Sequence, residues 1–146
     1  MQVFVKNFDE LTNSELYQLL RLRSEVFVVE QDCVYQDVDN KDQKALHVLG
    51  IKNGELVAYT RIFKPGDYFK NASIGRVVVN QDQRKFGLGK QIMQASLAAI
   101  EQKFPNQTIE ISAQSYLLKF YSELGFNAFG DEYLEDGIPH KRMVRG

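Results

Sequence analysis

Hydrophobic and polar residues along this chain follow two different periods, and each period predicts a different secondary structure. Alternation with period two is typical of strands, because successive side chains of a strand point to opposite faces. The Asn53-Gly54 pair favours a type I′ hairpin turn, since both central residues of that turn need positive φ. We expect strands over residues 2–6, 45–51, 55–63, 73–79 and 108–112, and one or two more from residue 127 onward, of which 138–144 is the clearest.

Apolar residues spaced three and four positions apart predict three helices. The first begins near Thr12, which forms a capping-box pattern with Glu15, while Leu11 and Leu16 occupy the positions of a hydrophobic staple. Its apolar face continues to residue 26 or 27. The second helix is expected over 87–104 and the third over 114–124, with Gly125 as its C-terminal cap.

The order of these elements is a strand, a helix, three strands, a helix, a strand, a helix and further strands. This order predicts an α/β sandwich built around a mixed sheet. Residues 32–44 are polar and are expected to form a loop, but no segment has the composition of a linker. We therefore expect one domain that covers residues 1–146.

Composition narrows the class of protein without identifying a function. The 146 residues are 44% hydrophobic and 25% charged, which is ordinary for a globular protein. A net charge of −1 gives no indication of a nucleic-acid partner. No apolar run approaches the ~20 residues that span a bilayer, and no signal pattern opens the chain, so we expect a cytoplasmic protein without a membrane partner. Cys33 is the only cysteine, which excludes an internal disulfide.

The segment "RKFGLGK", residues 84–90, connects an apolar strand to the second helix. A helix N-terminus offers free backbone N–H groups and a positive dipole, and glycines let the backbone approach an anion closely. Phosphate binding and a simple glycine turn are both compatible with this pattern. The segment lacks the glycine spacing of a Walker loop and the third glycine of a dinucleotide fingerprint, so neither of those sites is expected.

Longer motifs resemble a known family. "VVVNQDQRKFGLGKQIM" is similar to the acetyl-CoA-binding motif of the GNAT superfamily of acetyltransferases, and "AQSYLLKFYSELGF" is similar to its second CoA-side motif. Together with "VFVVEQDCVYQDVDNKD", "RVVV" and "EDGIPH", they resemble the ElaA-type members of that superfamily. The resemblance extends from about residue 20 to residue 143, and the motifs occur in the family's order.

This resemblance implies a GNAT-like α/β fold with a mixed, mostly antiparallel sheet and helices on both faces. Two neighbouring parallel strands, 74–79 and 108–112, would splay apart, and acetyl-CoA would lie between them as cosubstrate. Lys85 and Phe86 depart from the family, in which glycine often follows the arginine. The cosubstrate would bind the backbone of Val77, Val78 and Val79, the pyrophosphate loop of Arg84, Lys85, Phe86, Gly87, Leu88, Gly89 and Lys90, and Gln114.

The same resemblance gives Tyr121 a catalytic role. By helical period Tyr121 lies on the apolar stripe, so an isolated tyrosine there would be expected in the core. The family pattern instead implies that its hydroxyl protonates the departing CoA thiolate, which a largely protonated phenol can do. Gln114 would contact pantetheine or cap the helix.

An amine attacks a thioester only when it is neutral, so a general base is also expected. Glu30, His47 and His140 are the candidates, and the sequence does not choose among them. Each also has a structural alternative, since a strand histidine such as His47 is often simply packed. Five acidic residues could attract a cationic amine, although charged loops are usually solvated: Asp37, Asp39, Asp42, Glu135 and Asp136.

Two other kinds of site are not supported. The Asp37-x-Asp39 pattern lacks the glycine and the final glutamate of a calcium loop, so no metal is expected. Cys33 stands beside apolar Val34, where a cysteine is usually unreactive.

The expected function is acetyl transfer from acetyl-CoA to a primary amine on a small molecule or peptide. The main alternative is a CoA-binding sensor or interaction module without turnover, and a third is a nucleotide-phosphate binder. The sequence leaves the acceptor open, and it allows either a monomer or a homodimer.

Overall fold

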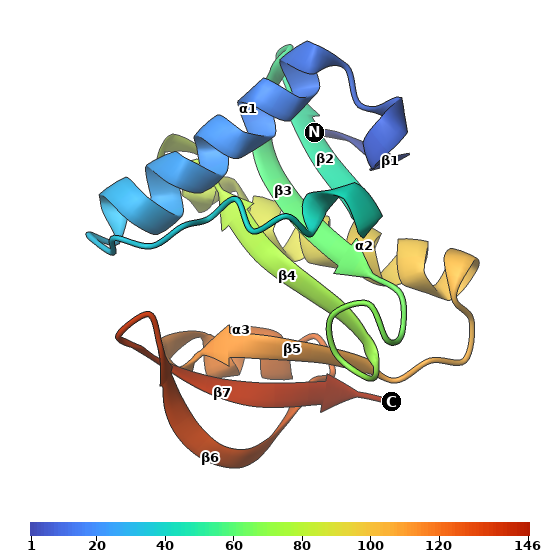
Figure 1. Cartoon of the computed structure of the whole chain (residues 1–146), viewed down its shortest axis with the longest axis vertical. Coiled ribbons are helices and arrows are strands. Elements are labelled where there is room, and N and C mark those ends of the chain that lie inside the picture. Colours follow the sequence, from blue (N-terminus) through green and yellow to red (C-terminus); the bar gives the residue numbers. More distant parts are fainter.

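The computed structural model describes all residues 1–146 and contains one seven-stranded sheet (Figure 1). The spatial order of the strands is β1-β2-β3-β4-β5-β7-β6, and every neighbouring pair is antiparallel except β4 and β5. The mixed, mostly antiparallel sheet that was expected is thereby confirmed. The strands are β1 (Gln2–Asn7), β2 (Leu46–Lys52), β3 (Glu55–Phe63), β4 (Ala72–Val79), β5 (Ile109–Gln114), β6 (Asn127–Glu135) and β7 (Ile138–Arg145).

Helices cover both faces of the sheet. Helix α1 (Asn13–Arg23) begins at the capping box, in which Thr12 Oγ1 accepts a hydrogen bond from the Glu15 backbone. Its buried face packs with Leu49 and Tyr59 of the sheet. Helix α2 (Leu88–Lys103) packs on the opposite face against residues such as Val48. Because Val48 and Leu49 are consecutive in one strand, their side chains point to opposite faces, and each face has its own hydrophobic cluster.

The chain between α1 and the sheet differs from a simple helix end. After Arg23 it continues as a π-helix (Ser24–Glu30), a wider turn that extends the expected apolar face through buried Val26. Residues 31–42, which we call the strap, then cross in front of β4 with little regular structure (Figure 1). A short 3-10 helix (Asp42–Lys44) leads from the strap into β2.

The third helix is shorter than the sequence predicts. Residues 114–124 were expected to be helical, but Gln114 is the last residue of β5, where it pairs with His140 of β7. A 3-10 turn (Ser115–Leu117) follows, and helix α3 spans only Leu118–Ser122. Pairing with β7 extends the strand, and the local helical pattern of the sequence carries no information about that partner.

Two adjacent irregularities open the middle of the sheet. Strands β4 and β5 pair only through Ala72 with Ile109 and Ser73 with Glu110, and beyond these pairs they diverge. On its other side β4 carries a β-bulge, because Arg76 and Val77 both lie opposite one residue of β3. The expected splay of two parallel strands is therefore present.

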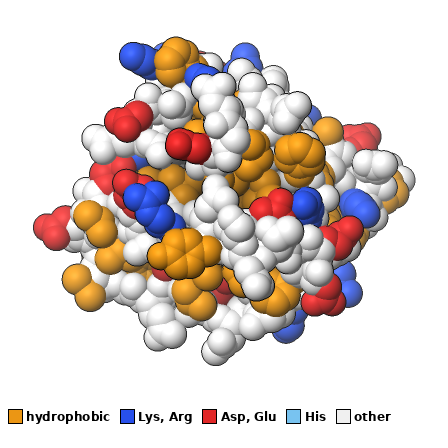
Figure 2. Space-filling view, turned by 90° about the horizontal axis from the view of Figure 1, so that it is seen from above, with side chains coloured by type: hydrophobic (Ala, Val, Ile, Leu, Met, Phe, Trp, Pro, Cys, Tyr) orange, Lys and Arg blue, Asp and Glu red, His pale blue; other side chains and the backbone are white.

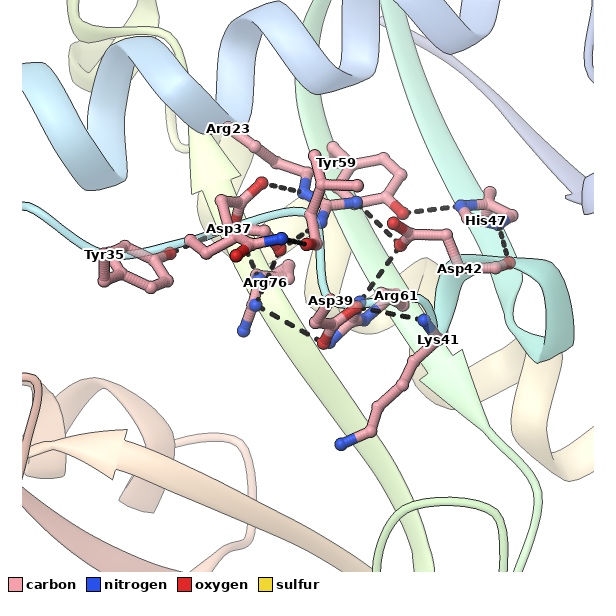
Figure 3. Close-up of polar contacts among 12 residues, drawn as sticks. Arg23, Tyr35, Asp37, Asp39, Lys41, Asp42, His47, Tyr59, Arg61 and Arg76 are labelled. Carbon is pink, nitrogen blue, oxygen red and sulfur yellow. Dashed lines mark hydrogen bonds and ion pairs between the residues drawn. The ribbon is translucent and has the colours of Figure 1, made fainter.

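The strap is fixed by buried ion pairs rather than left in solvent (Figure 3). Arg23 Nε is 2.8 Å from Asp37 Oδ2, and Arg23 Nη1 is 2.7 Å from Asp42 Oδ1. Arg61 contacts both Asp39 and Asp42. Although burial raises the pKa of Asp39, hydrogen bonds from Arg61 lower it to about 2. The expectation that Asp37, Asp39 and Asp42 attract a substrate is not supported, because arginines already neutralise these three carboxylates.

Charge is mixed on the face seen from above, from the end that carries α1. Basic, acidic and hydrophobic side chains are interspersed on this face (Figure 2). No helix of the structure combines the length and apolarity that crossing a membrane requires.

His47 connects the strap to the sheet interior. Its Nδ1 lies 2.5 Å from the Tyr59 hydroxyl and its Nε2 lies 2.9 Å from the Asp42 carbonyl oxygen. Burial lowers the pKa of His47, so the folded protein resists protonation of this ring. An unfolded chain binds that proton more readily, and stability must therefore fall as the pH drops below the usual histidine range.

We expect acidification from about pH 7.5 to about pH 5.5 to lower the free energy of unfolding by at most about 1.4 kcal/mol through His47. Urea denaturation at the two pH values measures the change. Asp39 and Asp42 titrate below this window, since their pKa values are also lowered. His47→Gln should remove most of the pH dependence. An unchanged pH dependence in His47→Gln would contradict the prediction.

Candidate functional site

A cavity of about 570 Å³ occupies the gap between the diverging ends of β4 and β5. One wall is formed by residues 74–79 of β4 and the other by Ile111, Ser112 and Gln114 of β5. The π-helix, the strap and the β6–β7 turn complete it on the remaining sides. Because β4 and β5 do not pair here, backbone groups of both strands are available to a ligand that enters the gap.

The three valines at the end of β4 all line this cavity. Val78 is buried and belongs to the cluster under α1, whereas Val77 and Val79 pack partly against the cluster under α2. The valine side chains therefore serve the core on both faces. This leaves their backbone, as the sequence analysis expected, as the part that could bind a ligand.

The loop after β4 forms a turn of 3-10 helix, η4 (Gln81–Phe86), before α2 begins. Gly87 has φ +70° and caps α2 in the left-handed conformation, which favours glycine. Gly87, Gly89 and Lys90 line the cavity together with Arg84. The N-terminus of the 16-residue helix α2, which carries free N–H groups, therefore forms part of the cavity wall.

The remaining loop residues lie outside the cavity lining. Leu88 is buried in the core, and Lys85 is exposed. Phe86 is half exposed, and the Lys52 ammonium lies 3.8 Å above the centre of its ring. The departure from the family pattern at Lys85 and Phe86 is therefore accommodated by side chains exposed to solvent.

Arg84 and Glu30 form an ion pair across the mouth of the cavity. Arg84 Nη2 lies 2.7 Å from Glu30 Oε1 and Arg84 Nη1 lies 2.5 Å from Glu30 Oε2, while Arg84 Nε donates to the Val79 carbonyl oxygen at 3.2 Å. The hydrogen bond to Glu30 raises the pKa of Arg84, which stays charged. Glu30 therefore lies next to the loop of residues 84–90 and is already paired with a cation, which makes it a poor general base in this state.

Tyr121 lies on α3 and lines the cavity. Its ring packs edge-on against Phe120, with centroids 5.1 Å apart, and against Phe126, with centroids 6.2 Å apart. Burial raises the pKa of Tyr121, so its hydroxyl remains protonated at neutral pH. Tyr121 therefore belongs to the core and to the cavity lining at once, because its ring is packed and the residue still borders the gap.

Gln114 bridges the two halves of the site. It ends β5, makes no helix-capping hydrogen bond, and exchanges weak side-chain hydrogen bonds of 3.4 Å with Gln31 of the strap. Both glutamines line the cavity. Of the two roles expected for Gln114, capping is therefore not observed and contact with a ligand stays possible.

A second polar group lies at the β6–β7 end of the cavity and includes His140. The His140 ring Nδ1 is 2.7 Å from the Ile138 carbonyl oxygen, and Nε2 is 3.3 Å from Glu135 Oε2. A carbonyl oxygen can only accept, so Nδ1 carries a proton and Nε2 of the neutral ring has the free lone pair. Ser112 hydrogen-bonds both Tyr133 and Glu135 beside it.

The structure brings most of the expected site residues together but separates the two histidines. His140 lines the cavity, whereas His47 is fully buried between Tyr59 and the strap and does not reach it. Three residues line the cavity that the sequence did not point to, Arg76, Tyr35 and Ser112. A charged residue beside three valines was a signal for Arg76, but nothing local marks the other two.

Known proteins are similar to this chain over nearly its full length. A model of the acetyltransferase (GNAT) domain matches residues 9–145. The ElaA protein of Escherichia coli strain K12 is 45% identical over 138 residues, which cover 93% of this chain and 90% of ElaA. A crystal structure of an acyl-CoA N-acyltransferase from Pseudomonas aeruginosa has a TM-score of 0.94 and 41% identity, with complete coverage of both chains. The crystal structure of E. coli ElaA has a TM-score of 0.93 and 40% identity, also with complete coverage of both.

Proposed function

Because the chain belongs to the GNAT family of acetyltransferases, we propose that it transfers an acetyl group from acetyl-CoA to a primary amine. The observation that carries this proposal is the cavity between the unpaired ends of β4 and β5. One end of the cavity meets the N-terminus of α2, which suits a phosphate, and the other end meets Glu135 and His140, which suit an amine.

In this proposal acetyl-CoA lies along β4. Its pyrophosphate meets the N–H groups at Gly87–Gly89 and the cations of Arg84 and Lys90, and its pantetheine arm pairs with the backbone of Val77 to Val79 as an added strand would. Binding then requires Arg84 to exchange its pairing with Glu30 for the pyrophosphate. The Arg84 side chain is 41% exposed, so this exchange needs no unfolding.

The amine attacks the thioester carbonyl directly, with both substrates bound. The new C–N bond forms as the carbonyl oxygen becomes an oxyanion, which backbone N–H groups near Val78 and Val79 stabilise. Collapse of the tetrahedral intermediate breaks the C–S bond. Tyr121 then donates its hydroxyl proton to the CoA thiolate, and its raised pKa means that this proton is present at neutral pH. The nitrogen of the new amide gives up its remaining extra proton, which restores the Tyr121 hydroxyl, so the products are the amide, the CoA thiol and the one proton taken by the base.

His140 is the proposed general base. Hydrogen bonding of Nδ1 to the Ile138 carbonyl oxygen fixes the tautomer that leaves Nε2 free to accept a proton from the substrate ammonium. The Glu135 carboxylate, 3.3 Å from Nε2, stabilises the imidazolium that forms. Glu30 and His47 have less support, since Glu30 lies beside Arg84 at the proposed phosphate end of the cavity and His47 lies outside the cavity.

The acceptor is proposed to be a cationic amine of a small molecule or peptide. Of the acidic residues around the cavity, Glu135 and Asp136 have no arginine or lysine partner. Glu135 and Asp136 would therefore attract the substrate ammonium group to the β6–β7 turn, next to the proposed base. The size of the acceptor is left open by this argument.

The rival proposal is a CoA sensor without turnover. A thiol-release assay with acetyl-CoA and a panel of polyamines, lysine peptides and amino sugars separates the two, because only the enzyme frees CoA as the amine is consumed. Binding without thiol release across the panel would favour the sensor. Thermal stabilisation by ATP but not by CoA would favour a nucleotide-phosphate binder instead.

We expect Tyr121→Phe to lower kcat by about 10²-fold or more, because the general acid is lost while the packed ring is retained. The Kd for acetyl-CoA, measured by calorimetry, should change little. Tyr17→Phe removes a hydroxyl from an exposed tyrosine of α1 and is the matched control. Equal losses of turnover and affinity, or a large fall in thermal stability, would instead indicate a structural role.

His140→Gln should lower kcat at neutral pH by about 10²-fold or more while acetyl-CoA affinity is retained, because the base acts only on the acceptor. Glu135→Gln should have a smaller effect, since it removes only the stabilisation of the imidazolium. Wild-type turnover in His140→Gln would assign proton removal to another group or to water.

Two glycine variants separate folding from binding. A Cβ added at Gly89 would lie 3.6 Å from the Phe120 ring and 3.8 Å from Val79, which are ordinary contacts between cavity-lining residues. Gly89→Ala should therefore fold normally but bind CoA about tenfold more weakly, a change of about 1.4 kcal/mol.

Gly87→Ala should instead lose about 1–2 kcal/mol of stability, because alanine is strained at positive φ. Calorimetry and thermal denaturation measure the two effects, and unchanged CoA binding in Gly89→Ala would argue against this ligand position.

A further inference from the structure

The bulge in β4 contains a strained residue at the edge of the cavity. Tyr59 pairs with Val78 and Arg61 pairs with Gly75, so Arg76 and Val77 together oppose Thr60. Arg76 has φ +49°, a left-handed conformation that is unfavourable for a residue with a side chain. Such strain persists only where surrounding contacts impose it.

The contacts that impose it come from the strap (Figure 3). Arg76 Nε donates to Asp37 Oδ1 at 2.8 Å, and Nη2 donates to the Asp37 carbonyl oxygen at 3.0 Å. Nη2 also lies 3.5 Å from Asp39 Oδ2, and the guanidinium lies 5.7 Å from the centre of the Tyr35 ring. A planar guanidinium held at two positions by one residue cannot rotate freely, so the direction of the Arg76 side chain is fixed.

Asp37 is itself held from a second direction. Arg23 of α1 donates through Nε to Asp37 Oδ2 at 2.8 Å and through Nη2 to the Asp37 carbonyl oxygen at 3.1 Å. The Tyr35 hydroxyl donates to Oδ1 at 3.0 Å. Asp37 is 7% exposed, and Arg23 is completely buried. A rigid chain of contacts thus runs from α1 through Asp37 to the bulge.

We propose that Arg76 is a positioning residue for the donor strand and that Asp37 is its anchor. This inference rests on the proposed function, because it concerns how β4 receives acetyl-CoA. Residues Val77 to Val79 follow Arg76 directly and no longer pair with β5. Fixing Arg76 in the bulge sets the direction of the N–H and C=O groups that pantetheine and the oxyanion would use.

Arg76 does not act in this proposal as a free cation for the phosphates of CoA. Its charge is neutralised by Asp37 and Asp39, and its side chain is only 18% exposed. The phosphate end of the cavity is formed by α2 and Arg84 instead. Loss of the Arg76 side chain should consequently disturb the pantetheine part of the ligand and not the nucleotide part.

The test compares two ligands on Arg76→Gln by calorimetry. CoA contains pantetheine, whereas adenosine 3′,5′-bisphosphate has the nucleotide without the arm. We expect CoA to bind about tenfold more weakly to Arg76→Gln and the bisphosphate to bind as it does to the wild type, with kcat reduced at saturating acetyl-CoA. Arg76→Lys should be intermediate, because it retains the charge but not the two-point contact.

Two further variants make the outcome decisive. Arg21→Gln removes an exposed arginine of α1 that is paired only with Glu25 and should leave both affinities unchanged. Asp37→Asn removes the carboxylate that holds Arg76, so it should cause the same selective loss of CoA affinity. Its thermal midpoint should also be lower, because Arg23 loses a charge partner. Wild-type CoA affinity and kcat in Arg76→Gln, or an equal loss of both ligands, would overturn the proposal.

The comparison also separates this inference from the proposed reaction. If the wild type binds CoA but releases no thiol with any amine, the proposed acetyl transfer is wrong. The comparison of the two ligands still tests the role of Arg76 in that case. If the wild type turns over and Arg76→Gln is unaffected, only the positioning role fails.

Discussion

Charge neutralisation between the strap and the arginines beneath it determines much of this structure. Burial of an unpaired arginine is very unfavourable, so Arg23 and Arg61 can occupy the interior only if carboxylates accompany them. Asp37, Asp39 and Asp42 supply those carboxylates from an irregular segment that has few other contacts to hold it. The strap, in turn, forms one side of the cavity and restrains the bulge of β4 through Arg76.

This use of charge changes the electrostatics of the site. Five acidic residues looked available to an amine in the sequence, but three of them are neutralised within the protein. Glu30 is also paired, with Arg84 of the loop before α2. In the cavity lining, the acidic groups without an arginine or lysine partner are therefore those of the β6–β7 turn, Glu135 and Asp136. Arg84 and Lys90 lie beside the N-terminus of α2 instead, so the two signs of charge lie on different elements of the cavity wall.

Local sequence patterns predicted the elements well where the pattern and the tertiary contacts agree. The capping box at Thr12, the Asn53-Gly54 turn and helix α2 are governed by neighbours in sequence, and all three are present. The prediction of a helix from residue 114 was wrong because Gln114 pairs with His140, a partner 26 positions later in the chain. The resemblance to ElaA-type GNAT proteins, carried by motifs in the right order, is confirmed by the comparisons.

The sequence by itself determined the secondary-structure elements and the position of the glycine loop through local periodicity, and its motifs, through their resemblance to GNAT proteins, implied the family and the splayed strands. Only the tertiary structure distinguished His47 from His140, two histidines in strands. His47 lies under the strap on β2, next to the edge strand β1, whereas His140 lies beside the gap that opens where β5 leaves β4. The place of Tyr121 beside the cavity also came from the tertiary structure. Its position on the apolar stripe of the helix accounts for the packed ring but not for the cavity that the residue borders. Which side chains meet a cavity depends on where two distant strands stop pairing, and no window of the sequence contains that fact.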